Sequence, residues 1–171
     1  MRYRRKMTLF RNRYRIESSR LSFWNYQMPC AYFITICTKN RDLLFGEIID
    51  GRMEATDRSR QCASAWHQLP NHFPHCRTDE FVIMPNHIHG ILILTRDSAD
   101  TDLASVSTII GAFKSFTSRA IHQRHDLLDR PIWQPRFHDR IIRGVAELTR
   151  IRKYIKNNPS NWSQDEHHPS A

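Results

Sequence analysis

Hydrophobic and β-branched residues gather in short runs that predict the strands of a sheet. Strands are expected over residues 32–38, 79–84, 87–95 and 139–143. The first run, Tyr-Phe-Ile-Thr-Ile-Cys-Thr, is typical of a buried strand. A hairpin is expected between residues 42 and 56, because Asp50-Gly51 is a favourable two-residue turn.

Apolar residues at helical spacing, together with end signals, predict three helices. They are expected over residues 57–69, 105–124 and 145–157. Asp57 is a predicted N-cap and Pro70 ends the first helix, while either Ser105 or Ser107 caps the second. Pro159 ends the third helix, because a residue before proline disfavours the helical conformation.

The order of these elements predicts an α+β fold. Strand, hairpin, helix, strand, strand, helix, strand and helix do not alternate as a doubly wound parallel sheet requires. The order fits an antiparallel or mixed sheet with helices packed on one face. At 171 residues, the chain suits one compact domain.

The net charge of the chain indicates a candidate binding partner. Twenty-six Lys and Arg residues against 17 Asp and Glu give a formal net charge of +9. Such an excess favours a polyanion, because each neutralised phosphate releases counterions, although charge that serves solubility alone has the same signature. The excess is densest in residues 1–20, which we interpret as a flexible basic arm before a domain at 21–165 and a short tail at 166–171.

The cysteines and the hydropathy indicate a reducing compartment. Four cysteines occur without a Cys-x-x-Cys pair, and the N-terminal residues lack the apolar segment of a secretory signal. The longest apolar stretch, residues 91–94, is too short to span a bilayer. Reduced thiols in the cytoplasm, with no membrane partner, are therefore expected.

The pair His87-Ile88-His89 is the main candidate for chemistry. Residues two apart on a strand face the same side, so both imidazoles project together. Two neutral imidazoles held in this way can bind a divalent metal ion. Two ordinary strand histidines would have the same pattern, so the pair needs support from elsewhere in the chain.

Tyr154 is the candidate nucleophile. Tyrosine can attack covalently but ionises near pH 10, and the neighbouring Arg152, Lys153 and Lys156 are expected to favour the phenolate. Asn158 follows one helical turn later, where an amide oxygen could join the histidines around a metal. A surface tyrosine with its ring on the core remains an alternative for this spacing.

Several segments, in order, resemble single-tyrosine transposases, and most closely the REP-associated tyrosine transposases of bacteria. They are YFITICT at 32–38, LFGEI at 44–48, MPNHIHGIL at 84–92, GAFKS at 111–115, WQPRF at 133–137, IIR at 141–143 and RKYIKNNP at 152–159. The resemblance covers roughly residues 15–168. One departure is Met28-Pro29-Cys30-Ala31, which stands where some members have a glycine-rich turn that helps to read DNA.

The resemblance implies a ferredoxin-like antiparallel core and a specific reaction. His87, His89 and Asn158 would hold Mg²⁺ or Mn²⁺, and Tyr154 would attack a DNA phosphate to give a 5′-phosphotyrosine and a free 3′-hydroxyl. The implied substrate is single-stranded DNA with hairpins of the repetitive extragenic palindromic (REP) type. The implied setting is the bacterial cytoplasm, at the nucleoid, for a monomer or homodimer.

Basic residues spread along the chain are candidates for DNA contacts. They are Arg11, Arg13, Arg15, Lys114, Arg119, Arg136, Arg143 and Lys153. Solvated surface charge is an equally simple interpretation for most of them. Trp133 and Phe137 could stack on bases, but packing in the core is favoured for both.

Three other functions compete with this interpretation. A catalytically inactive DNA-hairpin-binding protein derived from a transposase would keep the charge and the fold. A replication or conjugation nickase would use the same chemistry, although a chain this short argues against it. A zinc site could use a cluster whose spacings match none of the usual motifs: Cys62, His67, His72, His75 and Cys76.

Overall fold

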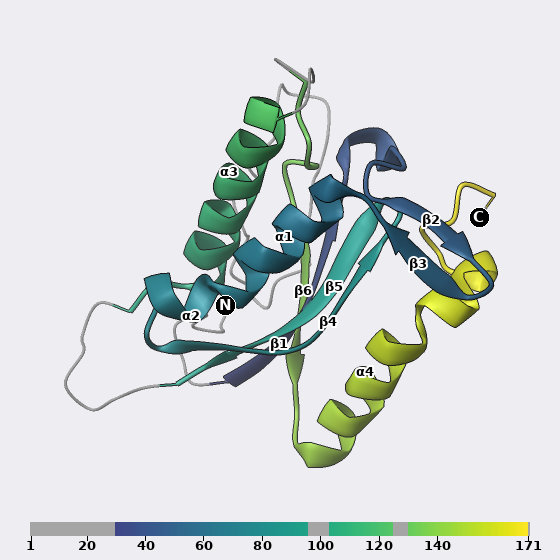
Figure 1. The fold of residues 1–171 in the computed structure, drawn as a ribbon. Helices are drawn as coiled ribbons and strands as arrows, with labels where there is room; N and C mark the ends of the chain where they lie inside the picture. The colour runs from purple at the N-terminus through teal and green to yellow at the C-terminus, as the bar shows by residue number, and fades with distance from the viewer. Residues whose placement is uncertain (1–29, 96–102, 125–129, 171) are drawn as a thin grey trace, which may run out of the picture.

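A four-stranded antiparallel sheet forms the centre of the protein (Figure 1). The computed structural model describes residues 30–95, 103–124 and 130–170, so the basic arm with Arg11, Arg13 and Arg15 lies outside the described residues. The strands, in spatial order, are β4 (Cys76–Met84), β5 (His87–Leu94), β1 (Cys30–Cys37) and β6 (His138–Ile142), and all neighbours are antiparallel.

Two helices cover one face of the sheet, as the sequence predicts for an α+β fold. They are α1 (Asp57–His67) and α3 (Val106–Arg124), which follow β1 and β5 and complete a βαββαβ unit of ferredoxin-like order. The main hydrophobic core lies between them and the sheet, with Tyr32, Trp66, Ile88 and Phe113 fully buried or nearly so. The predicted fold class is therefore confirmed.

The ends of these helices differ slightly from the sequence prediction. Thr56, rather than Asp57, caps α1, because its side-chain oxygen accepts the backbone N–H of Ser59. Pro70 occupies the first turn of a short helix, α2 (Leu69–His72), where a missing N–H costs nothing. Of the two N-cap candidates for α3, Ser105 rather than Ser107 caps the helix, since the Ser105 hydroxyl accepts the backbone N–H of Thr108.

The last helix, α4 (Val145–Asn157), lies on the opposite face of the sheet from α1 and α3 (Figure 1). A second, smaller core holds it there, built on buried Ile91, Ile142 and Ile155 with partly buried Leu148 and Ile151. The helices are thus divided between both faces, and the expectation of a single covered face holds for α1 and α3 only. The histidines of β5 point into the space beside α4.

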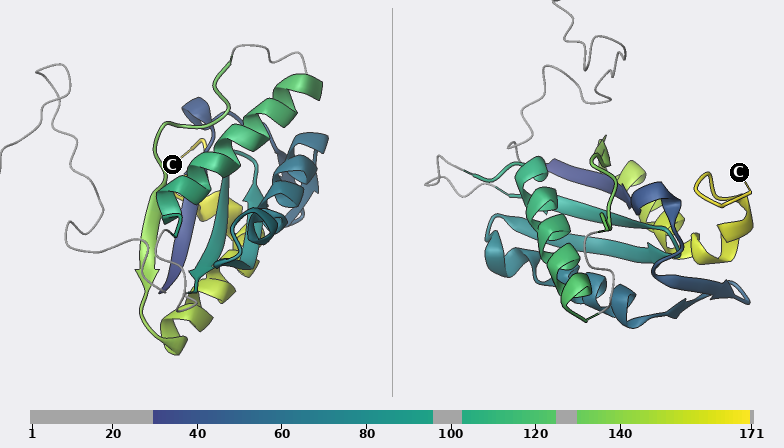
Figure 2. Two further views of the ribbon diagram at one scale, coloured as in Figure 1. Left: turned by 90° about the vertical axis from the view of Figure 1, so that its left-hand side faces the viewer. Right: turned by 90° about the horizontal axis from the view of Figure 1, so that it is seen from above.

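A hairpin projects from one end of the sheet and lies beside the C-terminal segment (Figure 2). Its strands are β2 (Gly46–Ile49) and β3 (Arg52–Ala55), and Asp50 and Gly51 form the turn, as predicted, with φ of 49° and 72°. The turn packs on Ser160 of the 3₁₀ helix η2 (Pro159–Gln164); another, η1 (Lys39–Arg41), follows β1.

Among the described residues, no helix is both long and apolar enough to cross a membrane.

Candidate active site

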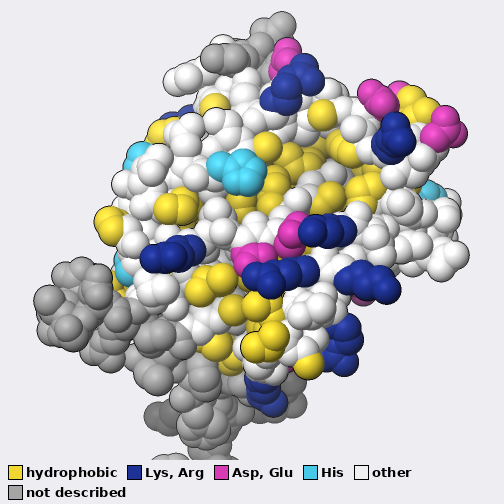
Figure 3. Space-filling model, turned by 60° about the horizontal axis from the view of Figure 1, so that its bottom comes forward, with side chains coloured by type: hydrophobic (Ala, Val, Ile, Leu, Met, Phe, Trp, Pro, Cys, Tyr) yellow, Lys and Arg dark blue, Asp and Glu magenta, His cyan; other side chains and the backbone are white. Residues whose placement is uncertain are grey.

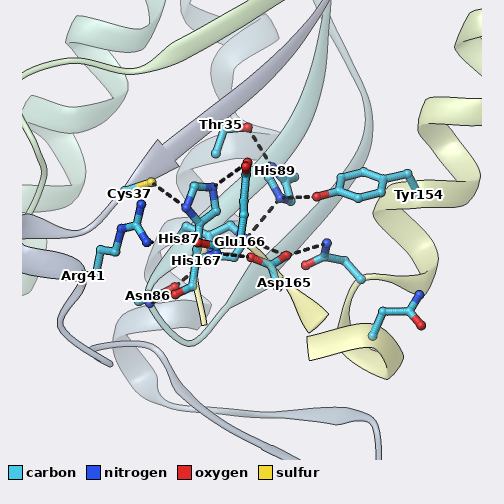
Figure 4. Close-up of polar contacts among 12 residues, drawn as sticks. Thr35, Cys37, Arg41, Asn86, His87, His89, Tyr154, Asp165, Glu166 and His167 are labelled. Carbon is cyan, nitrogen blue, oxygen red and sulfur yellow. Dashed lines mark hydrogen bonds and ion pairs between the residues drawn. The ribbon is translucent and has the colours of Figure 1, made fainter. Parts of the chain in front are cut away.

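His87 and His89 lie side by side on the central strand β5 and face α4 (Figure 4). Both side chains are buried, and their Nε2 atoms are 3.1 Å apart. The second nitrogen of each ring has its own partner: Nδ1 of His87 is 2.8 Å from Asn86 Oδ1, and Nδ1 of His89 is 2.9 Å from Thr35 Oγ1. These contacts hold the two rings with their Nε2 atoms converging.

The hydrogen bonds of Asn86 determine which nitrogen of His87 carries a proton. Asn86 Nδ2 donates to the backbone carbonyl of His167 at 2.7 Å, so the amide oxygen is the group that faces His87 Nδ1. Nδ1 must therefore carry the hydrogen, which leaves a lone pair on Nε2. A histidine arranged in this way is ready to coordinate a metal ion through Nε2.

Burial keeps both imidazoles neutral. Desolvation, with His167 and Arg41 adding to it, lowers the pKa of His87 to about 3. Desolvation and then the neighbouring His87 hold the pKa of His89 well below its usual value. Because neutral imidazole is the form that binds metals, neither ring has to lose a proton at neutral pH.

Tyr154 extends from α4 toward the histidine pair. Its hydroxyl oxygen is 3.3 Å from His89 Nε2, and the residue is 45 % exposed, so a substrate can reach it from solvent. The Phe33 ring meets the Tyr154 ring edge to face, with centroids 5.9 Å apart. Ile151 and Ile155 on the same helix pack on the sheet and fix the position from which Tyr154 projects.

The neighbours of Tyr154 do not favour its phenolate, contrary to the expectation from sequence. Burial, followed by the negative charges of Asp165 and Glu166, raises the pKa of Tyr154 to about 12. Arg152 instead donates its Nε–H to Asp79 at 2.9 Å, and the Lys156 ammonium pairs with Glu80 at 2.9 Å. Two of the three cations near Tyr154 in sequence are therefore engaged by β4.

Asn158 is buried at the end of α4, one turn after Tyr154. Its Nδ2 donates to Asp165 Oδ2 at 3.1 Å. Its Oδ1 is buried without a hydrogen-bond partner among the described residues. A buried amide oxygen with a free lone pair is costly unless it accepts from water or binds a cation, and this orphaned acceptor is consistent with a metal ligand.

Two residues of the site were missed by the sequence analysis. Asp165 and His167 are both buried beside His87, with Asp165 Oδ2 3.9 Å from His87 Nε2. His167 was predicted to lie in a short tail, yet its ring centroid is 4.5 Å from that of His87. The only signal in the sequence was an Asp-x-His triplet shortly after the tyrosine helix, and chain folding alone brings it to β5.

Among the described residues, one group of side chains has the geometry to hold a metal ion: His87, Asp165 and His167, whose donor atoms all lie within 4.8 Å of one another. His89 adjoins this group through His87. None of the five residues of the competing zinc cluster belongs to it. Cys62 and Cys76 are core residues, and burial raises the pKa of each thiol to about 12.

The predicted DNA contacts within the described residues comprise one partly buried residue, Lys114, and several exposed ones. The Lys114 ammonium donates to the backbone carbonyls of Gln134 and Arg136, each at 2.9 Å, and burial lowers its pKa to about 8. Lys114 therefore holds the segment before β6 in place, and its predicted DNA contact stays a prediction. Trp133, as favoured, is in the core, where its Nε1–H donates to Thr117 at 2.9 Å.

The other predicted contacts within the described residues are exposed: Arg119, Arg136, Arg143 and Lys153. Arg119 lies over the Phe116 ring, 5.5 Å from its centroid. Both residues belong to α3, on the opposite side of the sheet from α4. On the face shown in Figure 3, Lys and Arg side chains are interspersed with acidic and hydrophobic ones. The described surface there is basic but mixed.

Comparisons with known proteins agree with this architecture. Residues 26–158 match the family described as "Transposase IS200 like". An uncharacterized protein of Haemophilus influenzae is 34 % identical over 166 residues, covering 88 % of this chain and 91 % of its own. A REP-associated tyrosine transposase, solved bound to a REP hairpin, has a similar fold: the TM-score is 0.61 at 21 % identity, covering 86 % of this chain and 77 % of the other.

Proposed function

Because this chain belongs to the IS200-like transposase family, we propose that it cleaves and rejoins single-stranded DNA beside hairpins through a covalent bond to Tyr154. The observation that carries the proposal is the convergence of Tyr154 on the paired imidazoles, with its hydroxyl 3.3 Å from His89 Nε2. A protein that only binds DNA needs no exposed phenol beside two buried, neutral histidines.

His87 and His89, with the free oxygen of Asn158, are the residues that would hold Mg²⁺ or Mn²⁺ during cleavage. Such an ion supplies charge stabilisation at the scissile phosphate as negative charge develops. The protein contributes the orientation of the ligands: Asn86 and Thr35 hold the Nδ1 atoms, so that each Nε2 faces the site.

Tyr154 would attack the phosphorus, which forms a 5′-phosphotyrosine and releases a 3′-hydroxyl. The phosphodiester energy is retained in the new bond, so joining to another 3′-hydroxyl needs no ATP. The high pKa of Tyr154 indicates that the hydroxyl is protonated before the reaction. Part of that elevation comes from Asp165 and Glu166, and movement of these carboxylates away from the site would make ionisation easier.

The DNA partner we propose is a single strand folded into a hairpin of the REP type. The similar fold of a transposase bound to a REP hairpin supports this choice, as does the net charge of +9. Arg136, Arg143 and Lys153 are exposed and available for phosphate contacts. We place the reaction in the bacterial cytoplasm, at the nucleoid, and expect a monomer or a homodimer.

The test is a cleavage assay on labelled single-stranded hairpins from the flanks of the gene, with Mg²⁺ or Mn²⁺ and a denaturing gel. We expect a protein-linked DNA product from the wild type and none from Tyr154→Phe, because that variant lacks the attacking oxygen. His87→Ala should abolish the same product. Tyr14→Phe, in the predicted N-terminal arm, is the matched control and should keep it.

The competing function predicts a different result. Hairpin DNA that is shifted in a native gel, but is never cut or linked to the protein with either metal, would identify a binding protein without catalysis. Cleavage that persists in Tyr154→Phe would show that another residue is the nucleophile. Metal-independent cleavage would remove the proposed role of the histidines.

A further inference from the structure

The residues that follow η2 return the chain to the histidine pair and place two more donor groups there (Figure 4). Asp165 and His167 are both at least nine-tenths buried. Nε2 of His167 has no hydrogen-bond partner among the described residues, although the Glu166 carboxylate lies 3.5 Å away. A buried nitrogen in this condition is costly unless something binds it.

Hydrogen bonds hold this C-terminal segment in place. Asn86 donates to the His167 carbonyl at 2.7 Å, and the His167 backbone N–H donates to Asp165 Oδ1 at 2.7 Å. The other carboxylate oxygen, Oδ2, accepts from Asn158 and lies 3.9 Å from His87 Nε2. These contacts hold the segment and still leave His167 Nε2 and a second lone pair of Asp165 Oδ2 without a hydrogen-bond partner.

The complete set of donors is three imidazoles and one carboxylate. His87, Asp165 and His167 offer atoms within 4.8 Å of one another, and His89 Nε2 is 3.1 Å from His87 Nε2. Ligands at about 2.0–2.2 Å around a tetrahedral ion lie about 3.3–3.6 Å from one another, so the donor atoms need to move together by an ångström or more to bind it. Imidazole-rich sets suit Zn²⁺, whereas Mg²⁺ prefers oxygen ligands and keeps several waters.

We propose that His87, His89, Asp165 and His167 form a four-ligand Zn²⁺ site that is closed by the C-terminal segment. It shares two histidines with the site of strand cleavage but replaces Asn158 by a carboxylate and a third imidazole. Closed four-coordinate zinc sites are structural, because catalysis needs a position left open for water or substrate. Zn²⁺ held by four protein groups leaves no position for a phosphate oxygen.

The consequence for activity rests on the proposed function. If Mg²⁺ or Mn²⁺ supports cleavage, Zn²⁺ stabilises an alternative state in which the C-terminal segment stays in the site and DNA phosphate is excluded. The zinc site itself does not depend on that function, because it is defined by ligand atoms alone.

The test is isothermal titration of the full-length protein with Zn²⁺ in the presence of a competing chelator. Asp165→Asn and His167→Ala should each weaken Zn²⁺ binding by at least about tenfold, since each removes one of four ligands. His168→Ala is the matched control: this neighbouring histidine packs on Trp162, outside the donor group, and its loss should leave the affinity unchanged. Asp165→Asn keeps the size of the side chain, so weaker binding by this variant reports the loss of a ligand rather than unfolding of the protein.

Co²⁺ in place of Zn²⁺ gives a readout of geometry that is independent of activity. Wild type should show the intense visible absorption of a four-coordinate ion, and His167→Ala the weak absorption of a six-coordinate, hydrated one. Equal Zn²⁺ affinity in wild type, Asp165→Asn and His167→Ala would overturn the inference, as would a weak Co²⁺ spectrum of the wild type. A wild type that binds Zn²⁺ through these ligands but cuts no DNA would support the inference and contradict the proposed function.

Discussion

The hydroxyl group of Thr35 orients one imidazole of the site, that of His89. It lies opposite His89 on the neighbouring strand β1, and its Oγ1 is 2.9 Å from His89 Nδ1. Both residues are buried, so solvent has little access to the contact. Groups of this kind affect metal affinity although they never touch the metal.

Thr35→Val should therefore weaken Mn²⁺ binding by about 10- to 100-fold with little change in the fold, because the shape is kept and only the hydroxyl is lost. Titration calorimetry of wild type and variant measures this. Thr35→Ser restores the hydroxyl and should recover most of the affinity. Equal weakening in Thr35→Ser would show that packing, not the hydrogen bond, is what matters.

Gly90 next to the histidine pair has a packing role. A Cβ at this position would lie 2.3 Å from Trp66 Cζ2 of α1, which is too close for two carbon atoms. Gly90→Ala should lower the free energy of unfolding by about 1–3 kcal/mol through overpacking, as measured by denaturant titration. Gly111→Ala is the control in α3, where a Cβ meets nothing within 4 Å and should stabilise by about 0.5–1 kcal/mol. Similar effects of the two substitutions would contradict this account.

At the scale of the element, α4 is attached by two carboxylates as well as by its small core. Asp79 of β4 accepts from Arg152, which with other contacts lowers the pKa of that carboxyl group. Glu147 in the first turn accepts the Arg143 backbone N–H at 2.7 Å, and that bond, with the Arg140 guanidinium, lowers the pKa of Glu147. Both groups are more acidic when α4 is docked.

The attachment of α4 should therefore weaken in acid. A carboxyl group whose pKa is lower in the folded state stabilises the fold above its unfolded pKa, about 3.9 for Asp and 4.3 for Glu. That stability is lost as the pH falls from there through the folded pKa. Amide hydrogen exchange in α4 should speed up relative to α3 between pH 6 and about pH 3. In Asp79→Asn with Glu147→Gln, most of this extra acceleration should disappear; if it remains, other groups attach the helix.

At the scale of the whole molecule, positive charge should dominate DNA affinity. The logarithm of the association constant for a single-stranded hairpin should fall linearly with the logarithm of salt concentration. Arg136→Ala and Arg143→Ala should each reduce that slope by about one, measured by fluorescence anisotropy over a salt series. Arg60→Ala, which removes a charge already paired with Asp57 on α1, is the control and should leave the slope unchanged. If none of these substitutions alters the slope, the DNA binds to another surface of the protein.

Local signals allowed much of this fold to be predicted from sequence, and long-range contacts explain what was missed. The β-branched runs of the strands, the Asp50-Gly51 turn and the helix end at Pro159 depend on residues close together in the chain, so they can be predicted directly from the sequence. The side of the sheet covered by α4 depends on Ile142 and Ile155 meeting Ile91. The raised pKa of Tyr154 likewise depends on burial and on Asp165 and Glu166, which no local pattern reveals.

The site shows the same division. The histidine pair was recognisable because strand geometry fixes the relation between residues two apart. His167 was not, because its place beside His87 arises from the turn after η2 and from Asn86 donating to its carbonyl. The surroundings of Lys114 were not predicted either, because a cation in an amphipathic helix gives no sign that backbone carbonyls will surround it.

The sheet separates two cores of unequal size. That separation determines which property of the protein mutations would remove first. The large core under α1 and α3 contains none of the residues placed in the active site, whereas the small core under α4 includes Phe33, whose ring lies against His89 and Tyr154. Substitutions that silence Tyr154, which is exposed and belongs to neither core, therefore leave most of the folding free energy intact. A lineage that no longer benefits from DNA mobility would lose catalysis first and keep a folded, basic protein for many generations, open to recruitment by its host.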